Sequence, residues 1–118
     1  MSVQVVGFDE LHMVRGDTGN IAPIMEVERE DQPNVYDPYV LQDGDTVMFR
    51  MAKNDKLILE KECFIDLENN KAILEIEPED TKPFEPRVYT YCFELITATG
   101  KHHTFIKDAR FVLEKELG

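Results

Sequence analysis

Apolar and polar residues alternate with a period of two along most of this chain. The pattern is clearest in segment 87–95, where four large residues fall on one face: Tyr89, Tyr91, Phe93 and Leu95. Segments 46–51 and 71–77 alternate in the same way. Successive side chains of a strand point to opposite faces, so this period predicts strands that each bury one face. The sequence therefore predicts an all-β fold.

Turn-forming residues separate these runs and predict how the strands are connected. Asn54-Asp55 predicts a tight hairpin, and turns are also expected at 68–70 and 98–101. Acidic residues after Pro78 predict one short helical turn over 78–81. Frequent short connections are typical of antiparallel sandwiches, so we expect about seven strands in one. The predicted core is Val47, Phe49, Met51, Leu74, Ile76, Tyr89, Tyr91, Phe93, Leu95 and Phe111.

Length and charge limit the classes of protein to consider. The 118 residues are 42% hydrophobic, and we expect residues 1–118 to form a single domain. The 13 basic and 24 acidic residues give a net charge of −11, which disfavours nucleic acids and anionic membranes as partners. Met1 to Glu10 has neither the basic nor the apolar region of a signal peptide, so we expect synthesis in the cytoplasm.

Residues that could carry catalysis or hold a metal are few. Cys63 and Cys92 are too few for a disulfide framework, and we expect them to be unbridged. His102 and His103 are adjacent and would point to opposite faces of a strand, so we expect no metal site and no cofactor. The only serine is Ser2, and no sequence feature marks a cysteine as activated. We therefore expect a protein that is not an enzyme.

Two short motifs have a functional and a structural interpretation. Asp43-Gly44-Asp45 superficially resembles a calcium loop, but the remaining ligand positions are missing, which favours a turn. Arg15-Gly16-Asp17 is the tripeptide that integrins recognise. Matches of three residues are common by chance, and Gly-Asp suits a turn between two strands. We interpret both motifs as turns.

The order of strand and turn signatures resembles a known family. Tyr91 directly precedes Cys92, and the chain has no tryptophan, so the antibody-type disulfide arrangement is not expected. From about Met13 to Glu116 the chain resembles immunoglobulin-like domains of phage and prophage structural proteins of Gram-positive bacteria, including the N-terminal domain of BppU-type baseplate upper proteins. The segments that carry this resemblance are 15–19, 41–49, 76–81, 88–95, 100–106 and 111–114.

The resemblance implies an immunoglobulin-like antiparallel β-sandwich without catalytic residues. The expected function is that of a virion component of tail, baseplate or head, which binds other phage structural subunits and can form a homo-oligomer. The alternative is a module that binds carbohydrate or a host surface, for which exposed aromatic side chains would be needed. Candidate contact regions are Arg29 to Pro38, 43–45 and Glu114 to Gly118, and the candidate contact residues are Tyr36, Tyr39, Asp43 and Asp45.

Overall fold

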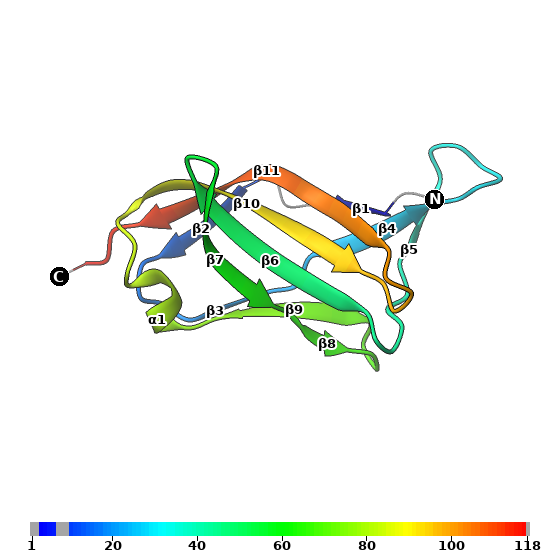
Figure 1. Ribbon diagram of the computed structural model, residues 1–118, viewed down its shortest axis with the longest axis horizontal. Helices are drawn as coiled ribbons and strands as arrows, with labels where there is room; N and C mark the ends of the chain where they lie inside the picture. Colours follow the sequence, from blue (N-terminus) through cyan, green and yellow to red (C-terminus); the bar gives the residue numbers. More distant parts are fainter. Residues whose placement is uncertain (1–2, 7–9, 118) are drawn as a thin grey trace.

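Eleven strands and one short helix make up the part of the chain, residues 3–6 and 10–117, that the computed structural model describes (Figure 1). They are β1 (Val3–Val6), β2 (Glu10–Val14), β3 (Gly19–Ile21), β4 (Ile24–Glu28), β5 (Tyr36–Pro38), β6 (Thr46–Lys53), β7 (Lys56–Glu62), β8 (Phe64–Asp66), β9 (Lys71–Ile76), α1 (Pro78–Thr81), β10 (Arg87–Ile96) and β11 (His102–Glu114). The predicted all-β fold is confirmed. The strands outnumber the predicted seven because segments as short as β3, β5 and β8 also pair.

The strands form three sheets. The largest has the order β2-β11-β10-β6-β7, and the two smaller sheets have the orders β1-β4-β5 and β3-β9-β8. Every pairing is antiparallel except that of β2 with β11, which is parallel. The long strand β11 has an irregular register against β10.

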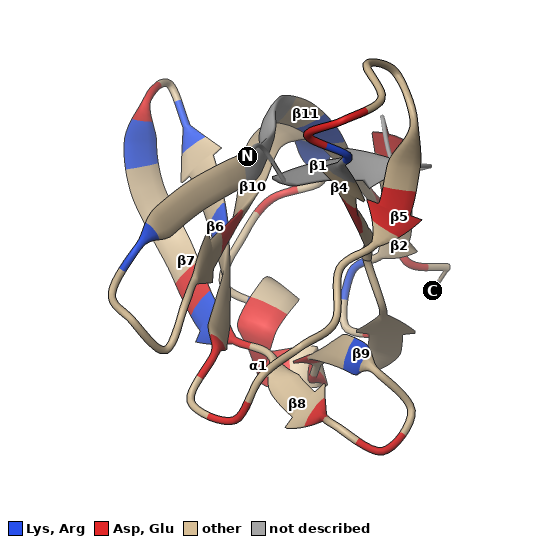
Figure 2. Ribbon diagram, turned by 90° about the vertical axis from the view of Figure 1, so that its right-hand side faces the viewer, with Lys and Arg blue, Asp and Glu red and all other residues tan. Residues whose placement is uncertain are grey.

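The core lies between the large sheet and the small sheet β3-β9-β8, which closes the lower side of the molecule (Figure 2). Burial alternates along β6 and β10, so every second side chain points into this space. The central strand of the small sheet, β9, contributes Ala72, Leu74 and Ile76 from the opposite side. All ten predicted core residues are buried, with at most 2% of any of them exposed.

Local sequence explains the turns that connect these layers. Asn54 and Asp55 both have positive φ angles, 51° and 64°, which is the backbone of the tight turn between β6 and β7. Pro78 opens α1, and the Asp80 side chain accepts a hydrogen bond from the Glu77 N–H at 2.8 Å. The hairpin and the helical turn were both predicted, and both are confirmed.

The molecule is elongated, with extents of 54 × 27 × 22 Å. The connection from β4 to β5 projects from one end of the molecule (Figure 1). The segment Arg29 to Pro38 was predicted to be a surface loop throughout. In the structure, residues 29–35 form the loop. Residues 36–38 form β5, which pairs antiparallel with β4 through backbone hydrogen bonds of the kind found in a hairpin.

Candidate contact surfaces

Asp45 ties together the loops at one end of the molecule. Its side chain is buried, with the residue 7% exposed, and accepts three hydrogen bonds. The Tyr39 hydroxyl and the Gln42 N–H donate to Oδ2, each at 2.8 Å, and the Ala98 N–H donates to Oδ1 at 2.9 Å. The carboxylate therefore links the turn 41–45 to the hairpin between β10 and β11. Asp45 therefore stabilises these loops.

Tyr39 is held at both its hydroxyl and its backbone. Partial burial, followed by the hydrogen bond to the Asp45 carboxylate, raises the pKa of Tyr39 to about 12. The Asn70 side chain accepts from the Leu41 N–H at 2.7 Å and donates to the Tyr39 carbonyl at 2.9 Å. The third loop of this end, between β8 and β9, is thus fastened to the other two.

The other two predicted contact residues lie apart from this network. Tyr36 is half-buried on β5, in register with Glu28 of β4. Asp43 is exposed in the turn before β6, next to Gly44. Gly44 has a φ of 92°, and a Cβ there would lie 3.1 Å from the Ala98 Cβ, so the turn requires glycine. The structure brings Tyr39 and Asp45 together, and of the four it leaves Asp43 the most open to a partner.

Arg15-Gly16-Asp17 is a turn, as interpreted from the sequence. The Arg15 guanidinium donates to the Phe84 carbonyl at 2.9 Å and to the Lys82 carbonyl, and it pairs with Glu116. The Gly16 N–H donates to the buried Thr81 hydroxyl at 2.8 Å. These bonds hold the segment against α1 and the end of the chain, whereas integrin ligands present this tripeptide on a mobile loop.

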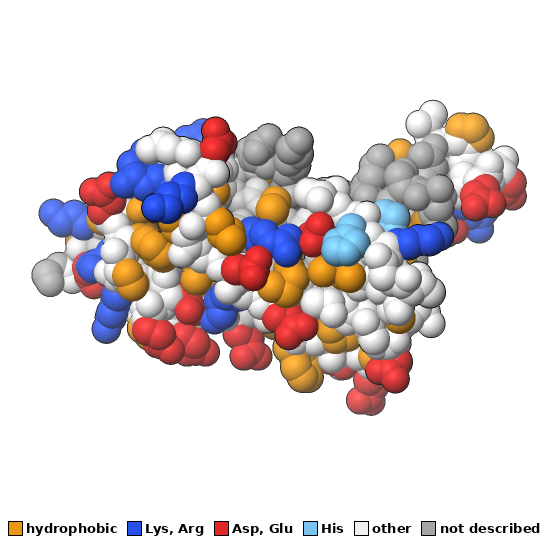
Figure 3. Space-filling model, in the orientation of Figure 1, with side chains coloured by type: hydrophobic (Ala, Val, Ile, Leu, Met, Phe, Trp, Pro, Cys, Tyr) orange, Lys and Arg blue, Asp and Glu red, His pale blue; other side chains and the backbone are white. Residues whose placement is uncertain are grey.

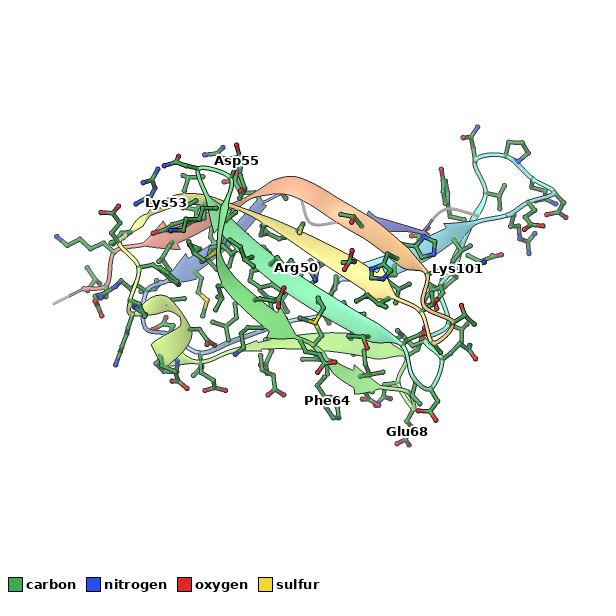
Figure 4. The ribbon with its side chains drawn as sticks, viewed as in Figure 1. Arg50, Lys53, Asp55, Phe64, Glu68 and Lys101 are labelled. Atoms are coloured by element: carbon green, nitrogen blue, oxygen red, sulfur yellow. The ribbon has the colours of Figure 1, made fainter. Side chains whose placement is uncertain are left out.

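A surface that the sequence did not reveal surrounds Phe64, the first residue of β8. Phe64 is 60% exposed, and its side chain points away from the body of the molecule (Figure 4). It is in register with the half-buried Ile73 on β9. A groove of about 450 Å³ opens beside it, lined by 61–65, Ile73 and Glu75. This is called the Phe64 groove below.

The Phe64 groove lies in an acidic part of the surface. Acidic side chains gather along the lower edge of the molecule, beneath β8, β9 and α1 (Figure 3). Glu62 and Glu75 line the groove itself. Glu68, in the turn after β8, points to the same side as Phe64 (Figure 4). An apolar ring with carboxylates beside it suits protein contact better than it suits binding of an anion.

Cys63 lies at the floor of this groove, where the chain passes from the large sheet to the small one. Its N–H donates to the Val47 carbonyl at 2.8 Å, and the residue is buried. Burial, and then the charge of Glu62, raises the pKa of the Cys63 thiol to about 12, so the nucleophilic thiolate is suppressed. Cys63 and Cys92 form no disulfide, as predicted.

Among residues 3–6 and 10–117, no group of three His, Cys, Asp or Glu side chains is placed to hold a metal ion. No helix in this described part of the chain is long and apolar enough to cross a membrane. Comparison of the chain with protein families, with curated proteins and with solved structures finds no match.

Proposed function

We propose that this chain is a structural subunit of a phage or prophage virion, in the tail, baseplate or head, and acts through protein–protein contacts rather than catalysis. The order of its strand and turn signatures, which resembles that of immunoglobulin-like phage domains, supports this proposal. We further propose that the two layers around the core are those of an immunoglobulin-like sandwich, to which short edge strands have been added.

The observation that carries the assembly function is the exposure of Phe64. A phenylalanine ring in water loses part of the hydrophobic free energy that burial would provide, and covering the exposed part of Phe64 is worth about 1–2 kcal/mol. The ring stands beside a groove and on β8, the last strand of its sheet. Edge strands and apolar patches are the surfaces that partner chains cover.

The alternative function, carbohydrate or host-surface binding, finds less support in the loop aromatics. A sugar platform needs a flat aromatic face in solvent. The Tyr39 hydroxyl is engaged by Asp45, and both Tyr36 and Tyr39 are half-buried. Assembly is therefore the function that the surface supports better.

Co-expression with the products of neighbouring structural genes tests this proposal. We expect a stable complex that Phe64→Ser weakens. Val40→Ser is the matched control, because Val40 is 62% exposed but lies near the Asp45 end of the molecule. Loss of the complex in Val40→Ser alone would place the contact at the end of the molecule that holds the predicted contact residues Tyr39, Asp43 and Asp45 instead. Absence of any complex, with binding of a polysaccharide by the isolated chain, would refute the assembly function.

A further inference from the structure

Charged side chains are arranged differently on the outer face of the large sheet, around Arg50, and at the Phe64 groove. On the large sheet, Arg50 stands at the centre of an ion-pair cluster, with Nε 2.7 Å from a Glu60 oxygen and Nη1 2.9 Å from a Glu94 oxygen. Opposite charges there neutralise each other within the molecule. At the Phe64 groove, by contrast, no described cation pairs with the carboxylates of Glu62 and Glu75.

Lys61, which itself lines the groove, and Lys71 of β9 are directed to other groups. Lys61 Nζ donates to the Glu75 carbonyl at 2.7 Å and pairs with Asp80 of α1. Lys71 lies in register with Asp66 at the other end of the β8–β9 pair. Hydrogen bonds from Asn69 are the main cause of the lowered pKa of Asp66, and the charge of Lys71 adds to it. Because Lys61 is paired with Asp80, the carboxylates of Glu62 and Glu75 leave the groove with a net negative charge beside an exposed phenylalanine ring.

We propose that the Phe64 groove binds an extended basic segment of a partner protein. An apolar side chain of that segment packs on Phe64 and Ile73, and a lysine or arginine beside it pairs with Glu62 or Glu75. This inference rests on the proposed assembly function and adds the chemistry of the partner. Opposite charge brings such a segment to the surface, and the apolar contact holds it there.

The extended form follows from where the groove lies. β7 is the last strand of the large sheet and β8 the last strand of the small sheet, and the groove lies where one leads into the other. An edge strand presents backbone donors and acceptors that an added strand can use. Side chains of an added strand alternate between its two faces, so a basic residue two positions from an apolar one lies on the same face and suits a surface where carboxylates flank a ring.

A second copy of this chain is a poorer occupant. Each copy carries a net charge of −11, so two copies repel each other as the acidic surfaces approach. A basic segment on a different protein meets no such repulsion. The proposed partner is therefore another protein, and self-association through this groove is an outcome against the proposal.

The inference is tested by following the amide chemical shifts of the isotope-labelled whole chain during titration with a short capped peptide that repeats Lys-Thr-Leu-Thr, which places lysine and leucine on one face of an extended strand. We expect shifts at 61–65 and 73–75. Phe64→Ala is expected to weaken binding at least about tenfold, because the anchor ring is lost. Val40→Ala, equally exposed, is the control and should bind as the unaltered chain does.

The charge requirement is tested separately. Replacing Glu62 and Glu75 by glutamine is expected to weaken binding by about fivefold to tenfold and to reduce its dependence on salt. The control is Glu30→Gln with Asp31→Asn, which changes the net charge equally but lies in the loop 29–35.

Three results would overturn the inference: shifts confined to 39–45, equal binding of a peptide in which glutamate replaces lysine, or dimerisation through the groove. If Phe64→Ser still breaks the complex with neighbouring subunits, the assembly function stands and only the basic partner is wrong. If neither peptide nor subunit binds, both proposals fail.

Discussion

Replacing Asp45 by alanine is the sharpest perturbation of the loop end. The substitution removes all three hydrogen bonds of the carboxylate and leaves the Gln42 and Ala98 N–H groups without their acceptor. At about 1 kcal/mol net for each bond, the expected loss of unfolding free energy is about 3 kcal/mol. That is a large share of the roughly 5–15 kcal/mol that stabilises a typical domain. We expect a clearly lower denaturation midpoint.

Urea denaturation of Asp45→Ala and of Tyr39→Phe measures this effect. Tyr39→Phe removes only the hydroxyl bond, so it should cost about 1 kcal/mol, and almost nothing when Asp45 is already alanine. Tyrosine-resolved NMR titration should also show the pKa of Tyr39 falling from about 12 towards the ordinary 10.0 in Asp45→Ala. An Asp45→Ala chain that keeps both its stability and the raised tyrosine pKa would refute the assignment of Asp45 as the link between these loops.

Three further predictions concern the core, the thiols and the pairing of β2 with β11. Phe93→Ala should cost about 3–5 kcal/mol in urea denaturation, since the ring is fully buried; an unchanged midpoint would contradict this. Thiol titration should find Cys63 unreactive in the folded chain and both cysteines reactive after denaturation; immediate reaction of Cys63 would contradict its burial. The pKa of His12 is raised, first by Glu114 and then by Glu10, so its contribution to stability is complete below about pH 6.5 and declines as pH rises through the higher folded value. His12→Gln should flatten that decline in thermal melts, and an unchanged pH profile would contradict the pairing.

Sequence periodicity predicted the core well because every second side chain of a strand points to the same face of the sheet, so apolar residues at alternate positions are buried together. Tyr89 to Leu95 alternate without interruption, and β10 lies centrally between β11 and β6, so nothing competes with the pattern. The turns were predictable for a similar reason. Asn54-Asp55 can adopt the left-handed backbone that a two-residue hairpin needs, and few other residue pairs do so readily.

The roles of the loop residues could not be predicted in the same way. The sequence makes Asp45 and Tyr39 candidates for external contact, because they are polar or aromatic and lie near turns. Their hydrogen bond joins residues six positions apart, but the Ala98 bond joins positions 45 and 98, which only the fold brings together. A buried carboxylate and an exposed one have the same sequence signature. What distinguishes them is the tertiary environment.

The Phe64 groove could not be predicted because the face of the chain that is buried changes where the chain passes from one sheet to another. In the sequence, segment 57–65 is an apolar-rich run of strand length, and nothing in it marks Phe64 as exposed. The chain instead leaves β7 at Cys63, whose side chain takes the buried position, and begins β8 at Phe64 with the ring outside. The alternation of apolar and polar residues does not show where the chain passes from β7 to β8. An apolar residue that directly follows such a buried crossing residue must face outward, because neighbours in an extended chain alternate. If that exposure is functional, Phe64→Ser should leave the stability of the isolated chain nearly unchanged while weakening its complex.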